Sequence, residues 1–150
     1  MDAIVLAGGF ARRMGELVRD TPKQLLPVGG APLLAHVLRS LEAVAPDRVL
    51  IAVNAAFASQ FDAFITSYDG PLQVELAVEQ ARSEGEKPGA LGALGQLVEA
   101  QRLAGPLFIA GGDNLFDFDL GRLAGLHKAT GDDIIALYDV QSRELAQLYG

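Results

Sequence analysis

Cysteine is absent from this sequence of 150 residues, and its 12 positively charged residues are outnumbered by 19 negatively charged ones. Without cysteine there is no disulfide, thiolate metal site or cysteine nucleophile, which fits a cytoplasmic protein. The formal net charge of −7 argues against nucleic-acid binding, because the phosphates of a polymer must be neutralised by clustered lysine and arginine. No apolar run approaches the ~20 residues needed to cross a bilayer, so no membrane partner is expected.

The N-terminus also lacks the basic segment of a signal peptide. An apolar run at residues 3–7 passes straight into Gly8 and Gly9, which predicts a strand followed by a turn. The basic residues are unevenly spread, and four of them gather early in the chain: Arg12, Arg13, Arg19 and Lys23. A local basic site on an acidic protein of single-domain length favours a small phosphorylated ligand over a polymer.

Short apolar runs alternate with segments of helical period along the whole chain. Strands are predicted at residues 3–7, 49–53, 72–78, 107–110 and 134–138. Helices are predicted between them, with apolar stripes at residues 33–41, 57–65, 91–98 and 120–127. This alternation predicts one α/β domain over residues 1–150, of the Rossmann-like doubly wound type, with a mostly parallel sheet and helices on both faces.

The order of the strands decides which loops meet. If the order is 3-2-1-4, the first and fourth strands are neighbours at the topological switch point, where ligands bind in open α/β sheets. The glycine-arginine turn after the first strand and the Gly111–Asn114 segment after the fourth then face one crevice. The two most unusual segments of the sequence are therefore expected to converge.

The turn after the first strand carries the first group of candidate site residues. Leu6 and Ala7 end the strand, and Gly8 and Gly9 let the backbone approach a ligand, where exposed N–H groups hold phosphate oxygens. Arg13 adds a planar cation that matches phosphate geometry. The turn is neither a Walker A motif nor a dinucleotide fingerprint. A plain strand-to-helix turn with solvated arginines is the alternative interpretation.

Two later segments present single charged groups. Pro22 and Pro27 fix the path around Lys23, so its ammonium can be aimed at a ligand with little entropy left to lose. Asp113 follows the fourth strand and is well placed to hold Mg²⁺, which usually binds one or two carboxylates together with phosphates. The alternatives are a surface lysine in a proline-rich connection and an Asp/Asn turn or helix cap.

A glycine-rich segment, Glu86–Leu94, enters the third predicted helix. The N-terminus of such a helix can admit a flat base or a phosphate. Tight packing of the helix on the sheet explains Gly92 and Gly95 equally well.

With these segments in view, the chain resembles the sugar-phosphate nucleotidyltransferases, also called nucleoside-diphosphate-sugar pyrophosphorylases. That family opens with L-A-G-G-x-G-T-R-L and continues with T-x-x-P-K-x-L-x-P-V. Residues 6–14 match the first motif in order and spacing, and within residues 21–28 the match to the second is continuous from Pro22 to Val28. Gly89–Leu94 and Gly112-Asp113-Asn114 are similar to two later motifs of the family, G-T-A-G-A-L and G-D-N.

The resemblance implies a Mg²⁺-dependent enzyme that transfers a nucleoside monophosphate from a nucleoside triphosphate to a sugar 1-phosphate and releases pyrophosphate. Carried over residue by residue, catalytic roles fall to Arg13 and Lys23, and the metal ligand is Asp113. The nucleotide-binding residues would be Leu6, Ala7, Gly8, Gly9 and Gly89. The loop before Gly89 is longer than in common members, so Gln80 is only a candidate for the glutamine that reads the base.

The chain departs from the family pattern in two respects. Ala11 and Arg12 replace the usual Gly-Thr, which makes the turn less permissive. Family members are also considerably longer, and their second metal-binding aspartate and much of the sugar pocket lie beyond residue 150. The chain is therefore expected to be a fragment lacking the C-terminal sugar-binding part, a minimal member, or one that completes its site by association, for example as a homo-oligomer.

Two other functions are open at this point. One is nucleotidyl transfer to a non-sugar acceptor of the molybdopterin type, since the Gly-Gly…Arg-Met-Gly run also resembles the molybdenum-cofactor guanylyltransferases. Those typically place the lysine sooner after Arg-Met-Gly, which favours the sugar class. The other is a non-catalytic nucleotide-binding module, which the short length favours.

Overall fold

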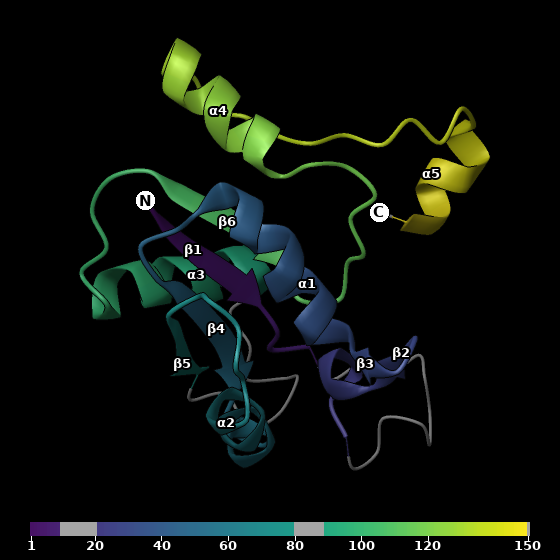
Figure 1. The fold of residues 1–150 in the computed structure, drawn as a ribbon. Helices are drawn as coiled ribbons and strands as arrows, with labels where there is room; N and C mark the ends of the chain where they lie inside the picture. Colours follow the sequence, from purple (N-terminus) through teal and green to yellow (C-terminus); the bar gives the residue numbers. More distant parts are fainter. Residues whose placement is uncertain (10–20, 80–88, 150) are drawn as a thin grey trace.

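A computed structural model describes residues 1–9, 21–79 and 89–149. Figure 1 shows a four-stranded sheet surrounded by helices, with a small hairpin beside it. The sheet contains β1 (Asp2–Leu6), β4 (Val49–Asn54), β5 (Val74–Glu79) and β6 (Leu107–Gly111), and the hairpin contains β2 (Pro27–Val28) and β3 (Ala31–Pro32). The α-helices are α1 (Leu33–Leu41), α2 (Ala58–Thr66), α3 (Gly89–Ala100), α4 (Gly121–Thr130) and α5 (Arg143–Tyr149). Two short 3-10 helices are η2 (Lys23–Leu25) and η3 (Glu42–Val44).

The strands of the large sheet are all parallel and lie in the order β5-β4-β1-β6. In chain order this is third, second, first, fourth, so the predicted order is confirmed. Leu6 of β1 is in register with Ala52 of β4 and Gly111 of β6. Because parallel strands run in one direction, their carboxyl ends share one edge of the sheet, where ligands bind in such folds.

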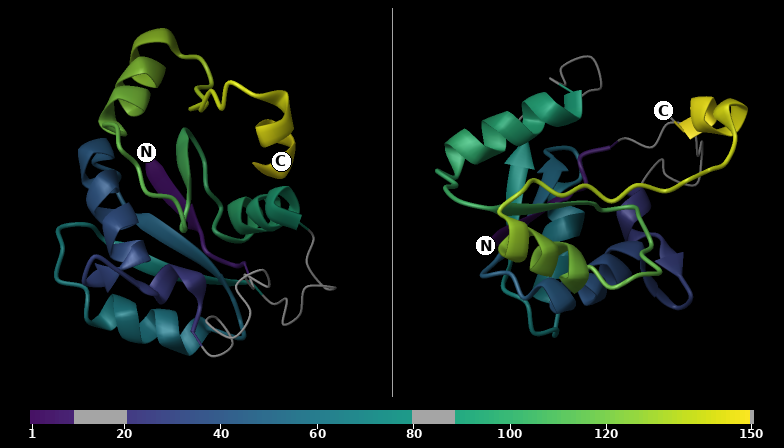
Figure 2. Two further views of the ribbon diagram at one scale, coloured as in Figure 1. Left: turned by 90° about the vertical axis from the view of Figure 1, so that its right-hand side faces the viewer. Right: turned by 90° about the horizontal axis from the view of Figure 1, so that it is seen from above.

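Helices cover both faces of the sheet, as predicted. On one face, the predicted apolar stripe of α1 is buried together with Phe61 of α2 and Ala124 of α4. On the other face, the side chains of α3 pack against β1 and β4, with Leu94, Leu97 and Val98 meeting Ile4, Leu50 and Ala52. The right-hand view of Figure 2 shows α3 on one side of the sheet and α1 and α4 on the other. The two central strands are therefore buried on both faces, which explains their continuous apolar sequence.

The fifth strand predicted at residues 134–138 is wrong. This segment belongs to no strand, and Ile135, Leu137 and Tyr138 are 77%, 85% and 89% exposed. An apolar sequence suits a buried strand, but a strand forms only where a neighbour satisfies its backbone groups. In the described part of the chain, nothing pairs with the outer edge of β6.

Two smaller features differ from what the residue patterns suggest. The described part of the segment between Gly8 and Gly30 contains η2 and β2, the first strand of the β2–β3 hairpin. A Cβ added to Gly95 would meet no atom within 4 Å, so tight packing does not explain that glycine. None of the described helices combines the length and apolar character needed to cross a membrane.

Candidate functional site

The two candidate loops leave the sheet from adjacent strand ends. Leu6, the last residue of β1, is in register with Gly111, the last residue of β6. The bonding continues one residue further, because the backbone N–H of Gly112 donates to the carbonyl oxygen of Leu6 at 2.9 Å. The segments that follow β1 and β6 therefore start side by side at the switch point of the sheet.

Gly112 allows the second loop to cross very close to β1. A Cβ at this position would lie 3.0 Å from the carbonyl oxygen of Leu6, 3.1 Å from Cγ1 of Val5 and 3.3 Å from Cβ of Ala7. Two of these contacts involve backbone or the first side-chain carbon, which cannot turn away. The close approach of the two backbones therefore requires glycine at position 112, directly before Asp113.

Lys23 is held by a rigid local backbone. The backbone N–H of Leu25 donates to the carbonyl oxygen of Pro22 at 2.9 Å, and that of Leu26 donates to Lys23 at 3.1 Å. Gln24, inside η2, is only 4% exposed. The N–H of Leu33 at the start of α1 donates to Leu26 at 3.0 Å, which ties the segment to the core helix. The backbone path around Lys23 is therefore set by the prolines and by these bonds.

Lys23 and Asp113 meet at the edge of the sheet. The ammonium nitrogen of Lys23 lies 3.0 Å from Oδ2 of Asp113, within hydrogen-bond and ion-pair distance. The two side chains are 35% and 41% exposed, so a ligand can reach both from solvent. Asp113 is thus paired with the proline-flanked lysine segment, whereas Arg13 of the glycine-arginine turn lies outside the described residues.

The carboxylate of Asp113 suits a hard cation that shares its coordination with a ligand. No described group of three or more His, Cys, Asp or Glu side chains is arranged to hold a metal ion. This excludes a closed protein cage within residues 1–9, 21–79 and 89–149. Mg²⁺ fits such a site, because it keeps several waters and takes one or two carboxylates plus phosphate oxygens.

The glycine turn after β1 is fixed by the neighbouring strand. The N–H of Ala7 donates to the carbonyl oxygen of Ala52 at 2.8 Å, and Nδ2 of Asn54 donates to the carbonyl oxygen of Gly8 at 3.1 Å. The side chain of Asn54 thus adds one hydrogen bond between the two chain segments beyond the backbone bond from Ala7. Gly8 itself has little room, because its Cβ would lie 2.9 Å from Oε1 of Glu79.

Gly9 differs from Gly8 in having open space around it. A Cβ on Gly9 would meet no atom within 4 Å. The described fold therefore does not require glycine at this position. A ligand that approached the backbone of Gly9 closely would require it.

Asn54 and Glu79 are site-edge residues that the sequence analysis missed. Asn54 is 0% exposed, and its Oδ1 has no hydrogen-bond partner. The bond that Nδ2 donates to Gly8 is therefore the hydrogen bond that stabilises this buried side chain. A signal was present, because both residues are polar and each directly follows a predicted strand. Polar residues at the carboxyl ends of parallel strands lie at the edge where ligands bind.

The remaining predicted site residues are unevenly covered by the structure. Arg13 and Gln80 lie outside the described residues. Gly89 is the first residue of α3, as the glycine-rich entry motif predicts, while the segment joining it to β5 lies outside the described ranges.

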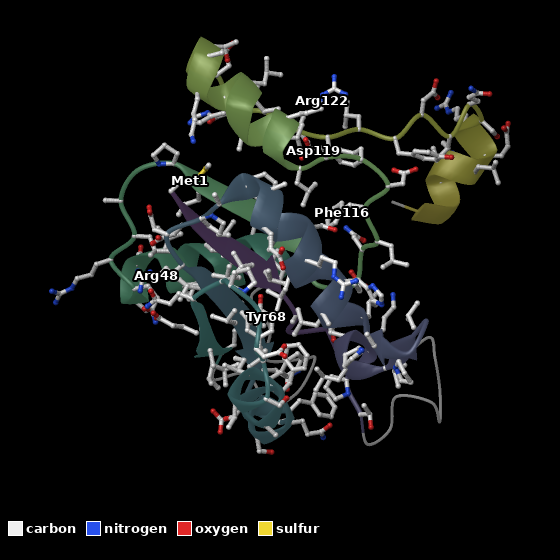
Figure 3. All side chains as sticks on the ribbon, in the orientation of Figure 1. Met1, Arg48, Tyr68, Phe116, Asp119 and Arg122 are labelled. Atoms are coloured by element: carbon white, nitrogen blue, oxygen red, sulfur yellow. The ribbon has the colours of Figure 1, made fainter. Side chains whose placement is uncertain are left out.

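The charged side chains at the amino-terminal edge of the sheet, opposite the candidate site, pair with one another. The guanidinium of Arg48 donates to Asp2 at 3.1 Å and to Glu75 at 3.4 Å, which links the amino ends of three strands. The neighbouring Asp2 carboxylate raises the pKa of Arg48 above its usual value. The N-terminal amine pairs with Asp47 and lowers the pKa of that carboxyl. Figure 3 labels Met1 and Arg48 on the side of the molecule where these pairs form.

A hollow of about 1070 Å³ lies between β6, α4 and the exposed segment that follows α4. Asp113 and Asn114 line it together with apolar side chains such as Leu115, Phe116 and Ile109. The rings of Phe116 and Phe118 meet edge to face, with centroids 6.0 Å apart. Asp113 thus stands between Lys23 and a mainly apolar hollow that the sequence did not predict.

Known proteins resemble this chain in sequence and in fold. Residues 3–149 match the model of the MobA-like NTP transferase domain. The chain is 30% identical over 140 residues to a mannose-1-phosphate guanyltransferase of Aspergillus oryzae, covering 89% of this chain and 36% of that protein. It is 28% identical over 136 residues to mannose-1-phosphate guanylyltransferase 1 of Arabidopsis thaliana, with the same coverage of 89% and 36%. The chain therefore spans little more than a third of these relatives.

Solved structures share the fold. A Bacillus anthracis protein named as a glucose-1-phosphate thymidylyltransferase superposes with a TM-score of 0.76 at 25% identity, over 86% of this chain and 50% of that one. A UDP-glucose pyrophosphorylase complexed with UDP-glucose has a TM-score of 0.68 at 18% identity, over 85% and 53%. A Mycobacterium tuberculosis protein in complex with manganese has a TM-score of 0.55 at 22% identity, over 86% and 60%. The predicted doubly wound α/β fold is confirmed.

Proposed function

Since the chain belongs to the MobA-like NTP transferase domain family, we propose that it is the nucleotide-binding part of a sugar-1-phosphate nucleotidyltransferase. The reaction joins the monophosphate of a nucleoside triphosphate to the phosphate of a sugar 1-phosphate and releases pyrophosphate. The observation that carries this proposal is the meeting of Lys23 and Asp113, 3.0 Å apart, beside the glycine turn at the switch point. The names of the sequence relatives favour a sugar phosphate as the acceptor.

The roles proposed for the residues follow from their charge and place. Gly8 and Gly9, after Leu6 and Ala7, offer backbone N–H groups to the triphosphate. Lys23 orients phosphate oxygens by its ammonium, and Arg13 offsets charge on the transferring group by its guanidinium. Little covalent work is asked of the chain, because positioning and charge stabilisation account for most of such a transfer.

We further propose that the cation held by Asp113 is Mg²⁺. Its single hard carboxylate, open to solvent, matches an ion that completes its shell with phosphates and water. When bound, Mg²⁺ supplies positive charge that offsets the negative charge of the phosphates.

Base recognition is proposed for the region of Gln80 and Gly89.

A cytoplasmic location belongs to the same proposal and rests on the absence of cysteine. Completion of the sugar pocket requires further residues, contributed by more of the same protein or by a second copy, since the chain spans only part of its relatives.

The test is a matrix of nucleoside triphosphates against sugar 1-phosphates, read by Mg²⁺-dependent release of pyrophosphate. GTP with mannose 1-phosphate is the first pair to try, because two relatives carry the corresponding name. We expect release only when both substrates and the cation are present. Triphosphate binding without release for any sugar phosphate, by this chain and by any longer natural form, would instead favour a non-catalytic nucleotide-binding module.

An acceptor other than a sugar is the second candidate, favoured by the family model being named for MobA. A molybdopterin-type acceptor included in the same matrix separates the two. Release that depends on such an acceptor and not on sugar phosphates would replace the first proposal.

A further inference from the structure

We propose that Lys23 serves as the internal counter-ion of Asp113 in the unliganded protein, so that phosphate binding and divalent-cation binding at this site promote one another. This inference rests on the function proposed above and adds a coupling between its two ligands. It starts from one ion pair, in which the Lys23 ammonium lies 3.0 Å from Oδ2 of Asp113.

The ammonium and a metal ion compete for the same carboxylate. A Mg²⁺ or Mn²⁺ ion binds a carboxylate oxygen at about 2.0–2.2 Å. With Lys23 still in place, two positive charges would stand only a few ångströms apart, in a site that is partly shielded from water. A cation therefore binds Asp113 well only after the ammonium of Lys23 has moved away.

The lysine side chain has the freedom to move, while its backbone does not. The side chain is 35% exposed and has a flexible four-carbon stem. Its backbone is bound within η2, where Leu26 donates to Lys23 and Leu25 donates to Pro22. The rearrangement is thus confined to one side chain and needs no opening of the fold.

Phosphate provides the reason for the move. A bound polyphosphate offers the ammonium several charged oxygens in place of one carboxylate oxygen, and this frees Asp113 for a cation that the same phosphates help to hold. By linkage, a ligand that releases Asp113 raises cation affinity, and the cation raises phosphate affinity by the same factor. The pair would thereby keep the site from binding a cation when no substrate is present.

The first experiment measures Mn²⁺ affinity without any phosphate ligand, by the electron paramagnetic resonance signal of free Mn²⁺. Lys23→Gln removes the competing ammonium and should tighten Mn²⁺ binding about two- to fivefold, the range expected for one partly exposed ion pair. Lys128→Gln is the charge-matched control. Lys128 lies on α4 within electrostatic range of Asp47, at the opposite edge of the sheet, and should leave Mn²⁺ affinity unchanged.

The second experiment measures pyrophosphate binding in the presence of EDTA, by isothermal titration calorimetry. Asp113→Asn frees Lys23 and should tighten metal-free binding about two- to fivefold. The gain should vanish when Asp113→Asn is made in the Lys23→Gln background, because no ammonium is left to release. Glu99→Gln, an exposed charge change on α3, serves as the control.

The double-mutant comparison decides between the ion pair and the general field of the site. An equal gain from Asp113→Asn in both backgrounds would mean that the carboxylate repels phosphate without acting through Lys23, and would overturn the proposal. Unchanged Mn²⁺ affinity in Lys23→Gln, or no metal-free pyrophosphate binding by any variant, would also overturn it. Both readouts are independent of turnover, so a failed search for nucleotidyl transfer leaves them interpretable.

Discussion

The side chains of Lys23 and Asp113 form an ion pair of 3.0 Å although they are 90 residues apart in the sequence. They meet because β1 and β6 are adjacent and parallel, so that the loops following both strands leave the same edge of the sheet. The hydrogen bond that the N–H of Gly112 donates to the carbonyl oxygen of Leu6 holds the second loop against the first strand. The candidate site is thus built from two segments that only the sheet brings together.

Asp113 and Arg13 should be essential for turnover if the proposed function holds. Asp113→Asn keeps the size of the side chain but weakens cation binding, and should lower Mg²⁺-dependent pyrophosphate release at least about 100-fold. Arg13→Ala removes charge stabilisation and should cost about 100- to 1000-fold. Arg39→Ala, a change at an exposed position of α1, and Glu99→Gln are the matched controls. Near wild-type rates in either Asp113→Asn or Arg13→Ala would refute the assignment of that residue.

Gly112→Ala should destabilise the protein at the edge of the site. Its new Cβ would lie 3.0 Å from the carbonyl oxygen of Leu6, so the loop and β1 must move apart. Overpacking of this kind costs about 1–3 kcal/mol, which urea unfolding can measure. Gly125→Ala is the control, because Gly125 lies within α4 with open space around its Cβ position. That change should stabilise the protein by about 0.5–1 kcal/mol; equal stabilities of the two variants would contradict the packing argument.

Gly9→Ala should separate binding from stability. No atom lies within 4 Å of its Cβ position, so the melting temperature should be unchanged. If a triphosphate lies against this backbone, the added methyl group should weaken nucleotide binding about tenfold, equivalent to about 1.4 kcal/mol. Calorimetry with the triphosphate measures the difference. Unaltered affinity would show that the ligand does not approach Gly9.

Asn54→Ala should loosen the glycine turn. The change removes the bond of 3.1 Å that Nδ2 donates to Gly8 from a fully buried position. We expect a loss of about 1–3 kcal/mol in the free energy of unfolding, together with weaker nucleotide binding. Asn54→Asp keeps the shape but replaces the donor with an acceptor, and should be no better than Asn54→Ala at neutral pH. Full stability in Asn54→Asp would argue against a role for the donated bond.

Tyr68 should make stability depend on alkaline pH. Burial raises the pKa of its hydroxyl above the ordinary value of 10.0. Below pH 10 the phenol is neutral in both states, but above it the unfolded chain loses the proton first, so stability falls as pH rises until the folded state also ionises. Comparing urea unfolding of the wild type and Tyr68→Phe between about pH 9 and 11 isolates this contribution. Identical slopes in the two proteins would exclude it.

Much of the fold follows from local patterns. The apolar runs at residues 3–7 and 49–53 become the buried strands β1 and β4, and the α1 stripe is buried as its period predicts. The strand order considered for a doubly wound sheet, 3-2-1-4, is the order observed. The same reasoning failed at residues 134–138, because an apolar run does not reveal whether a neighbouring strand is available.

The sequence by itself determined the family motifs, the parallel sheet and the loops that would carry the site, since each depends on residue type and short-range spacing. Tertiary structure alone decided that the Lys23 ammonium pairs with Asp113, that Asn54 bonds to Gly8 and that Glu79 flanks the same glycine. These contacts join residues that lie far apart in the sequence. Their distances depend on strand register and side-chain packing, which are set by the whole fold and by no local stretch of sequence.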